Sequence, residues 1–151
     1  MHSAPPAHLL VILSEAVPLV HAEDMVLVGL SVDSVAQLVA ALPSDRGFFS
    51  LTLDVWEASL VLPAGDWCGL AERCPDARVA GPYRLLTFDI PLELDLVGFL
   101  AAVSTALAAR DVPIYALSAV SRYHLLVRAA DLAAAEEALA ELRDEARRLL
   151  G

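Results

Sequence analysis

The residues between Tyr83 and Val127 constrain the fold of this chain more than any other stretch of its sequence. Apolar segments of strand length surround one longer Ala- and Leu-rich run, which lies between Asp95, a residue type that caps helices, and Arg110. The pattern predicts a strand, a loop, a helix and two further strands, over residues 83–89, 90–93, 96–109, 114–120 and 122–127. This order indicates half of an open sandwich, with helices on one side of a sheet.

A similar order of short apolar segments occurs in the first half of the chain. Strands are predicted over residues 8–13, 25–30, 48–53 and 59–62, helices over 31–42 and 67–74, and a last amphipathic helix over 132–150. Gly81-Pro82 marks the best boundary, so we expect two units, residues 1–80 and 81–151. The predicted fold class is α+β, with two ferredoxin-like (βαββαβ-type) units whose sheets are antiparallel and whose helices pack on one face.

The composition excludes several classes of protein. The formal net charge of −10 argues against nucleic acid and anionic membranes as partners, because both require clustered positive charge. The longest apolar run, residues 96–109, is shorter than the roughly 20 residues of a membrane-spanning helix. The N-terminus lacks a basic segment before an apolar one, so no signal peptide is expected and a cytoplasmic location is predicted.

The sequence offers little for catalysis or for metal binding. All ten basic residues are Arg, which excludes a phosphate-loop lysine and a Schiff-base lysine. Cys68 and Cys74 are too few and wrongly spaced for a zinc site, and the early histidines lack a third ligand at metal spacing. No serine lies in a nucleophile-elbow context. We therefore expect no catalytic residue, no metal and no cofactor, and we interpret Trp56 and Trp67 as core residues.

The second half of the chain carries the residues of a known family in order. They are Pro91, Leu92 and Glu93 before the predicted helix, Leu96, Gly98, Leu100 and Ala101 at its start, residues 112–118 (VPIYALS) after it, then residues 125–127 and Asp131-Leu132. With these residues the chain resembles the ACT domain, and it is similar to the tandem ACT pairs of small bacterial proteins and of CASTOR-type arginine sensors. The resemblance covers roughly residues 45–150 and is strongest over 81–132.

The resemblance implies a regulatory protein that binds a small molecule, usually an amino acid, between ACT units, and that could dimerise. The loop and helix start would supply Glu93, Leu94, Asp95, Val97 and Gly98. Physical chemistry agrees, because a helix N-terminus offers unpaired amides and a glycine there permits close approach. Close packing of helices is the alternative explanation for Gly98, as helix capping is for Asp95.

The predicted hairpin departs from the family pattern. Relatives carry a threonine and a ligand-facing aspartate where this chain has Ala119 and Tyr123, within a segment that starts at Ser118. The loss of a hydroxyl and a carboxylate disfavours a cationic amino acid, whereas Arg122, Tyr123 and His124 suit an anionic or aromatic ligand. Two alternatives stay open: an interaction module whose ligand site has decayed, and a small enzyme on the same frame.

Overall fold

The computed structural model describes residues 5–90 and 96–151, and the chain divides into two compact units. One unit is the continuous segment Ala22–Arg84, which we call the inserted unit. The other combines Met1–His21 with Leu85–Gly151, and we call it the outer unit. These limits differ from the predicted ranges 1–80 and 81–151, because both crossings between units fall inside long strands and Gly81-Pro82 lies within one of them.

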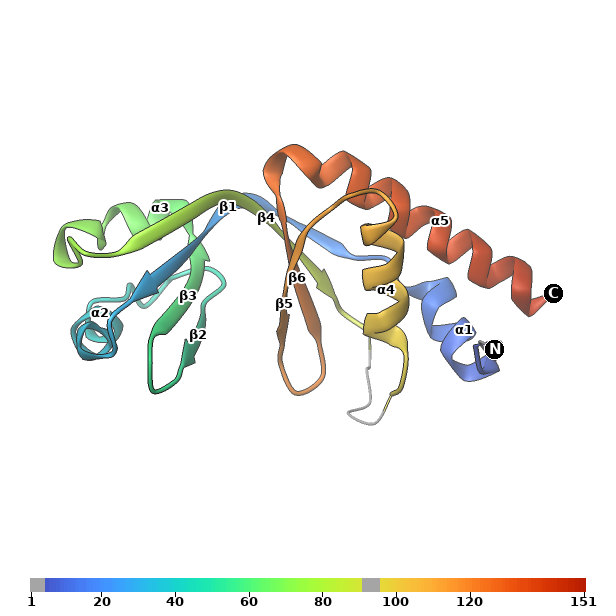
Figure 1. Ribbon diagram of the computed structural model, residues 1–151, viewed down its shortest axis with the longest axis horizontal. Helices are drawn as coiled ribbons and strands as arrows, with labels where there is room; N and C mark the ends of the chain where they lie inside the picture. The colour runs from blue at the N-terminus through green and yellow to red at the C-terminus, as the bar shows by residue number, and fades with distance from the viewer. Residues whose placement is uncertain (1–4, 91–95) are drawn as a thin grey trace. The chain divides into compact units, whose positions relative to one another are not determined.

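The inserted unit has a complete βαββαβ order. Its elements are β1 (Leu19–Leu30), η1 (Val32–Ser34), α2 (Val35–Ala40), β2 (Ser50–Leu53), β3 (Ala58–Pro63), α3 (Ala64–Cys68), η2 (Ala71–Arg73) and β4 (Arg78–Phe88), and it holds residues 22–30 of β1 and 78–84 of β4. β3 pairs antiparallel with both β1 and β2, and the strand order is β2-β3-β1-β4, which is the ferredoxin-like arrangement. The strands, α2 and α3 appear in blue to yellow-green in Figure 1.

The outer unit repeats this arrangement with longer helices. Its elements are α1 (Ala7–Glu15), the first residues of β1, the last residues of β4, α4 (Phe99–Ala108), β5 (Ile114–Ser118), β6 (Tyr123–Arg128), η3 (Ala129–Asp131) and α5 (Leu132–Leu150). The strand order is β1-β4-β6-β5, and β5 pairs antiparallel with β6. In Figure 1, α1 and α5 lie side by side and α4 stands beside β5 and β6.

Each unit has its own hydrophobic core on the helix face of its strands. In the outer unit, Leu86, Phe88, Leu125 and Val127 alternate along β4 and β6 and meet apolar residues of α1, α4 and α5. In the inserted unit, the corresponding alternation places Val26, Val28, Leu30, Ala58, Leu60 and Leu62 against Leu38 of α2 and Trp67 of α3. The predicted α+β class with two ferredoxin-like units is therefore confirmed.

Three local predictions were wrong. Residues 8–13 form helix α1 and no strand, since Leu9, Leu10 and Leu13 bury one side of a helix and a short apolar run does not distinguish the two structures. The two predicted sheets share strands: the hydrogen-bonded order runs β2-β3-β1-β4-β6-β5, because β1 and β4 are 12 and 11 residues long. Trp56 is 84% exposed, whereas Trp67 is in the core as expected.

Candidate functional site

The predicted ligand-binding residues that the structure describes belong to the outer unit. Glu93, Leu94 and Asp95 lie outside the described residues. The others lie at the start of α4 and in the turn between β5 and β6: Val97, Gly98, Ser118, Ala119, Arg122 and Tyr123. The relation of these two segments is set by aromatic rings on α4, β4 and β6.

The start of α4 requires glycine for two reasons. Gly98 precedes the helix with φ of 98°, a left-handed conformation that costs energy for other residues. A Cβ atom built on Gly98 would stand 2.9 Å from Cδ2 of Leu9 on α1, so α1 occupies the space beside this glycine. Close packing thus accounts for Gly98, and the neighbouring Val97, which is 80% exposed, marks the accessible side of the helix start.

Three aromatic rings pack the strands against this helix start. Phe99 is the first residue of α4, and its ring stacks on Tyr123 of β6 with centroids 5.7 Å apart and planes at 18°. The same ring meets Phe88 of β4 edge to face at 5.2 Å and 84°. Each ring has a sequence neighbour of functional interest, namely Gly98, Arg122 and Asp89. The ring cluster therefore brings the helix start, the hairpin and the end of β4 to one place.

The β5–β6 turn is tight and presents a charged pair. Ser118 and Tyr123 face each other across the two strands, and the amide of Ala119 donates a hydrogen bond of 2.9 Å to the carbonyl of Arg122. The Nε of Arg122 donates to Oδ1 of Asp89 at 2.5 Å, and the two side chains are 50% and 61% exposed. An exposed pair of this kind contributes only about 0–1 kcal/mol, so either charge can exchange its partner for a ligand at little cost.

A polar row that the sequence did not reveal crosses the outer unit. Oγ1 of Thr87 on β4 lies 2.8 Å from Nε2 of His21 on β1 and 2.9 Å from Nδ1 of His124 on β6. Burial lowers the pKa of His124, with smaller contributions from His21 and Arg122. Since these residues are far apart in sequence, only the pairing of three strands brings them together. His124 is buried in this row, whereas Arg128 at the end of the same strand is exposed.

A mostly apolar groove of about 820 Å³ lies among α1, α4 and α5. Its walls include Leu9, Leu13, Gly98, Ala102 and Leu142. At one side, Arg110 bonds with Glu141 at 2.5 Å and Glu137 at 3.4 Å, and Glu141 makes the larger contribution to raising the pKa of Arg110. These charges pair with one another, and Thr105 and Glu145 add two further polar residues to the lining. Among the described residues, no three His, Cys, Asp or Glu side chains gather to hold a metal ion.

The two units define an α+β protein of the ferredoxin-like class. Within it, residues 79–141 match the family model of the ACT domain. The resemblance of the sequence to the ACT domain is thus supported by a family match over this range, which includes α4, β5, β6 and the ring cluster.

Solved structures agree with this assignment. The chain is 27% identical to a protein of Agobacterium tumefaciens, with a TM-score of 0.62 over 80% of this chain and 84% of that one. A protein of unknown function from Vibrio cholerae has 21% identity and a TM-score of 0.67, covering 89% and 95% of the two chains. The ligand-free regulatory subunit of aspartate kinase from Thermus thermophilus has 15% identity and a TM-score of 0.62, covering 84% and 99%. The last two show a common fold.

No curated protein matches the sequence. Over residues 5–90 and 96–151, the structure contains no helix that is both long and apolar enough to cross a membrane.

Proposed function

We propose that this chain is a non-catalytic regulatory protein, with two ACT units in tandem, that binds a small amino acid-like metabolite in its outer unit. The observation that carries the proposal is the contact of Phe99 with both Phe88 and Tyr123. This contact supports the proposal, because Asp89, Arg122 and Gly98 are the sequence neighbours of the three contacting rings. The family match over residues 79–141 and the similarity to regulatory domains support the regulatory role.

The chemistry of this site suits a ligand that carries both a negative and a positive charge. The Arg122 guanidinium can bind a carboxylate through two hydrogen bonds, and the Asp89 carboxylate can accept from an ammonium group. The first amides of α4 add donors for an anionic group. A ligand with only one charge would leave the other member of the pair without its present partner. An amphoteric metabolite satisfies both.

Regulation would follow from a shift between arrangements of the protein. A ligand favours one arrangement only to the extent that it binds that arrangement more tightly. We propose a homodimer as the regulated assembly. A cytoplasmic location fits the two free cysteines, exposed Cys68 and buried Cys74, because a reducing compartment keeps thiols unpaired.

A thermal-shift screen against amino acids, nucleotides and small carboxylates tests the proposal. A ligand present at about 100 times its dissociation constant adds about 2.7 kcal/mol to the free energy of unfolding. The Val97→Arg variant should lose the response, because the new side chain occupies the accessible side of the α4 start. Val55→Arg is the matched control, since Val55 is 82% exposed and lies in the inserted unit. A screen in which both variants bind every hit equally well would refute the proposed site.

A second candidate function is an interaction module, and one observation favours it. Trp56 is 84% exposed at the turn between β2 and β3, next to Val55. The Asp54 carboxylate accepts hydrogen bonds from the amides of Trp56 (2.7 Å) and Glu57 (2.9 Å), which lower its pKa, the Glu57 bond making the larger contribution. The turn therefore holds the backbone of Trp56 and leaves its ring accessible.

Sedimentation equilibrium of the wild type and of Trp56→Ala distinguishes this candidate. If the turn mediates self-association, the variant should shift to the monomer, while Trp56→Phe retains part of the association. A wild type that is dimeric and a Trp56→Ala variant that dimerises equally well would remove the turn from consideration.

A further inference from the structure

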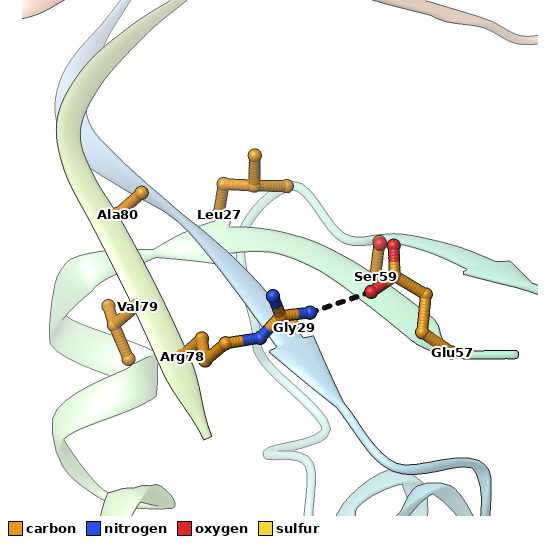
Figure 2. A pocket seen from close by; sticks show the side chains of 7 residues that line it. All are labelled: Leu27, Gly29, Glu57, Ser59, Arg78, Val79 and Ala80. Atoms are coloured by element: carbon orange, nitrogen blue, oxygen red, sulfur yellow. Dashed lines mark hydrogen bonds and ion pairs between the residues drawn. The ribbon is translucent and has the colours of Figure 1, made fainter.

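The inserted unit contains a pocket of its own, of about 240 Å³, on the face of its strands opposite the helices. Seven residues of β1, β4 and the β3 region line it, as Figure 2 shows: Leu27, Gly29, Glu57, Ser59, Arg78, Val79 and Ala80. All of them belong to residues 22–84. The pocket is therefore independent of the site described for the outer unit.

The strand register explains why the surface is hollow here. Val28, Leu30, Ala58 and Leu60 point into the core, so Gly29 and Ser59, which alternate with them, lie on the opposite face. Gly29 pairs with Ser59, and Ser59 pairs with Thr52 on β2. A row of three small residues thus crosses three strands, and no large side chain rises from it.

Arg78 extends over the start of this row. A Cβ atom built on Gly29 would stand 3.3 Å from Nη2 of Arg78, so the missing side chain provides the space in which the guanidinium lies. Figure 2 shows the guanidinium directed across Gly29 towards Glu57, and Nη2 lies 2.7 Å from Oε2 of that residue. The Arg78 and Glu57 side chains are 80% and 48% exposed, so their mutual attraction contributes little to stability.

We propose that this pocket binds a compact zwitterion, a ligand whose carboxylate pairs with Arg78 and whose ammonium group pairs with Glu57. The hydroxyl of Ser59 supplies a further polar partner, and Leu27, Val79 and Ala80 accommodate a short apolar group. A carboxylate alone would displace Glu57 and bring a further negative charge beside it, in a chain whose formal net charge is already −10. An amine alone would compete with Arg78 for the same carboxylate. A ligand with both groups avoids either conflict.

Isothermal titration and amide NMR with three probes test the charge requirement. The probes are alanine, which has both charges, propionate, which has only the carboxylate, and ethylamine, which has only the ammonium group. Alanine should bind at one site per chain and shift the amides of Gly29, Ser59 and Arg78. Propionate and ethylamine should bind at least about tenfold more weakly. Equal binding of propionate and alanine would overturn the zwitterion assignment, and unchanged inserted-unit amides would overturn the site.

Variants separate this pocket from the outer-unit site. Arg78→Gln should reduce alanine affinity at least about tenfold, since it removes the cation. Gly29→Val should do the same with Arg78 retained, because it fills the pocket and displaces only the flexible end of that side chain. The control Arg73→Gln removes an exposed arginine of η2, outside the pocket, and should bind normally.

Val97→Arg should leave alanine binding at Arg78 intact and affect only ligands of the outer unit. Loss of alanine binding in Val97→Arg with retention in Arg78→Gln would overturn the pocket while supporting the outer site. The reverse result supports the pocket and leaves the outer site to be judged by its own ligand.

Discussion

Two exposed arginine–carboxylate pairs of this chain have the same chemistry and different surroundings. Arg122 and Asp89 join the hairpin of the outer unit to the end of β4 beside three aromatic rings. Arg78 and Glu57 lie over small residues in the inserted unit. An ion pair at the surface stabilises either unit only slightly. We propose that the difference in surroundings, rather than the pair, decides what each position can bind.

The largest effect is expected from removing the ring that organises the outer site. Phe99→Ala deletes a side chain that is 1% exposed, and should lower the free energy of unfolding by about 3–5 kcal/mol. Urea denaturation measures this loss. The variant should also lose the outer-site ligand while the Arg78 pocket still binds alanine. Unchanged stability would show that the three rings do not organise the site.

Two glycine variants should change the free energy of unfolding in opposite directions. Gly98→Ala should destabilise by about 1–3 kcal/mol, because φ is 98° and the added Cβ meets Leu9. Gly65→Ala, in helix α3 with nothing within 4 Å of the added atom, should stabilise by about 0.5–1 kcal/mol. Thermal denaturation of both variants under identical conditions tests the comparison. A neutral Gly98→Ala would contradict the account of the α4 start.

The stability of the outer unit should fall in mild acid. The pKa of His124 is lowered in the folded protein, so the unfolded chain binds a proton first as the pH falls below about 6.5. The contribution of neutral His124 to stability is therefore complete above that pH and is lost progressively below it. Urea denaturation between about pH 7.5 and 5 measures the slope. His124→Asn should flatten it, and the exposed His8→Asn control should not.

The smallest effects on stability are expected at the two ion pairs themselves. Arg122→Gln and Arg78→Gln should each change the free energy of unfolding by less than about 1 kcal/mol. Their effects on binding should be separate, because each pair belongs to a different unit. A loss of several kcal/mol in either variant would mean that the pair is structural and not available to a ligand.

The sequence predicted the parts of the fold that depend on local periodicity. Helix α5 has the predicted limits, residues 132–150, because apolar and charged residues recur with the helical period over its 19 residues. The hairpin of β5 and β6 was also predicted within two residues. Helix α1 was missed, since nine mostly apolar residues show no clear period and gain their structure by packing on α5 and α4.

The candidate site could be predicted only in part. The start of α4 and the hairpin were identified from their residues, but Asp89, the partner of Arg122, was not, because 33 positions separate the two in sequence. The row of His21, Thr87 and His124 could not be predicted either, because its members lie far apart in sequence on three strands. Contacts between strands depend on the register of the sheet, which no local pattern in this sequence specifies.

We propose that the outer unit binds an amphoteric metabolite where the α4 start meets the hairpin. Amide NMR of the protein titrated with a pool of the standard amino acids, in the Arg78→Gln background that silences the inserted pocket, tests it most directly. We expect shifts at Asp89, Val97, Gly98 and residues 119–123, and their loss in Val97→Arg. Shifts confined to other parts of the chain, or none at saturating concentration, would contradict it.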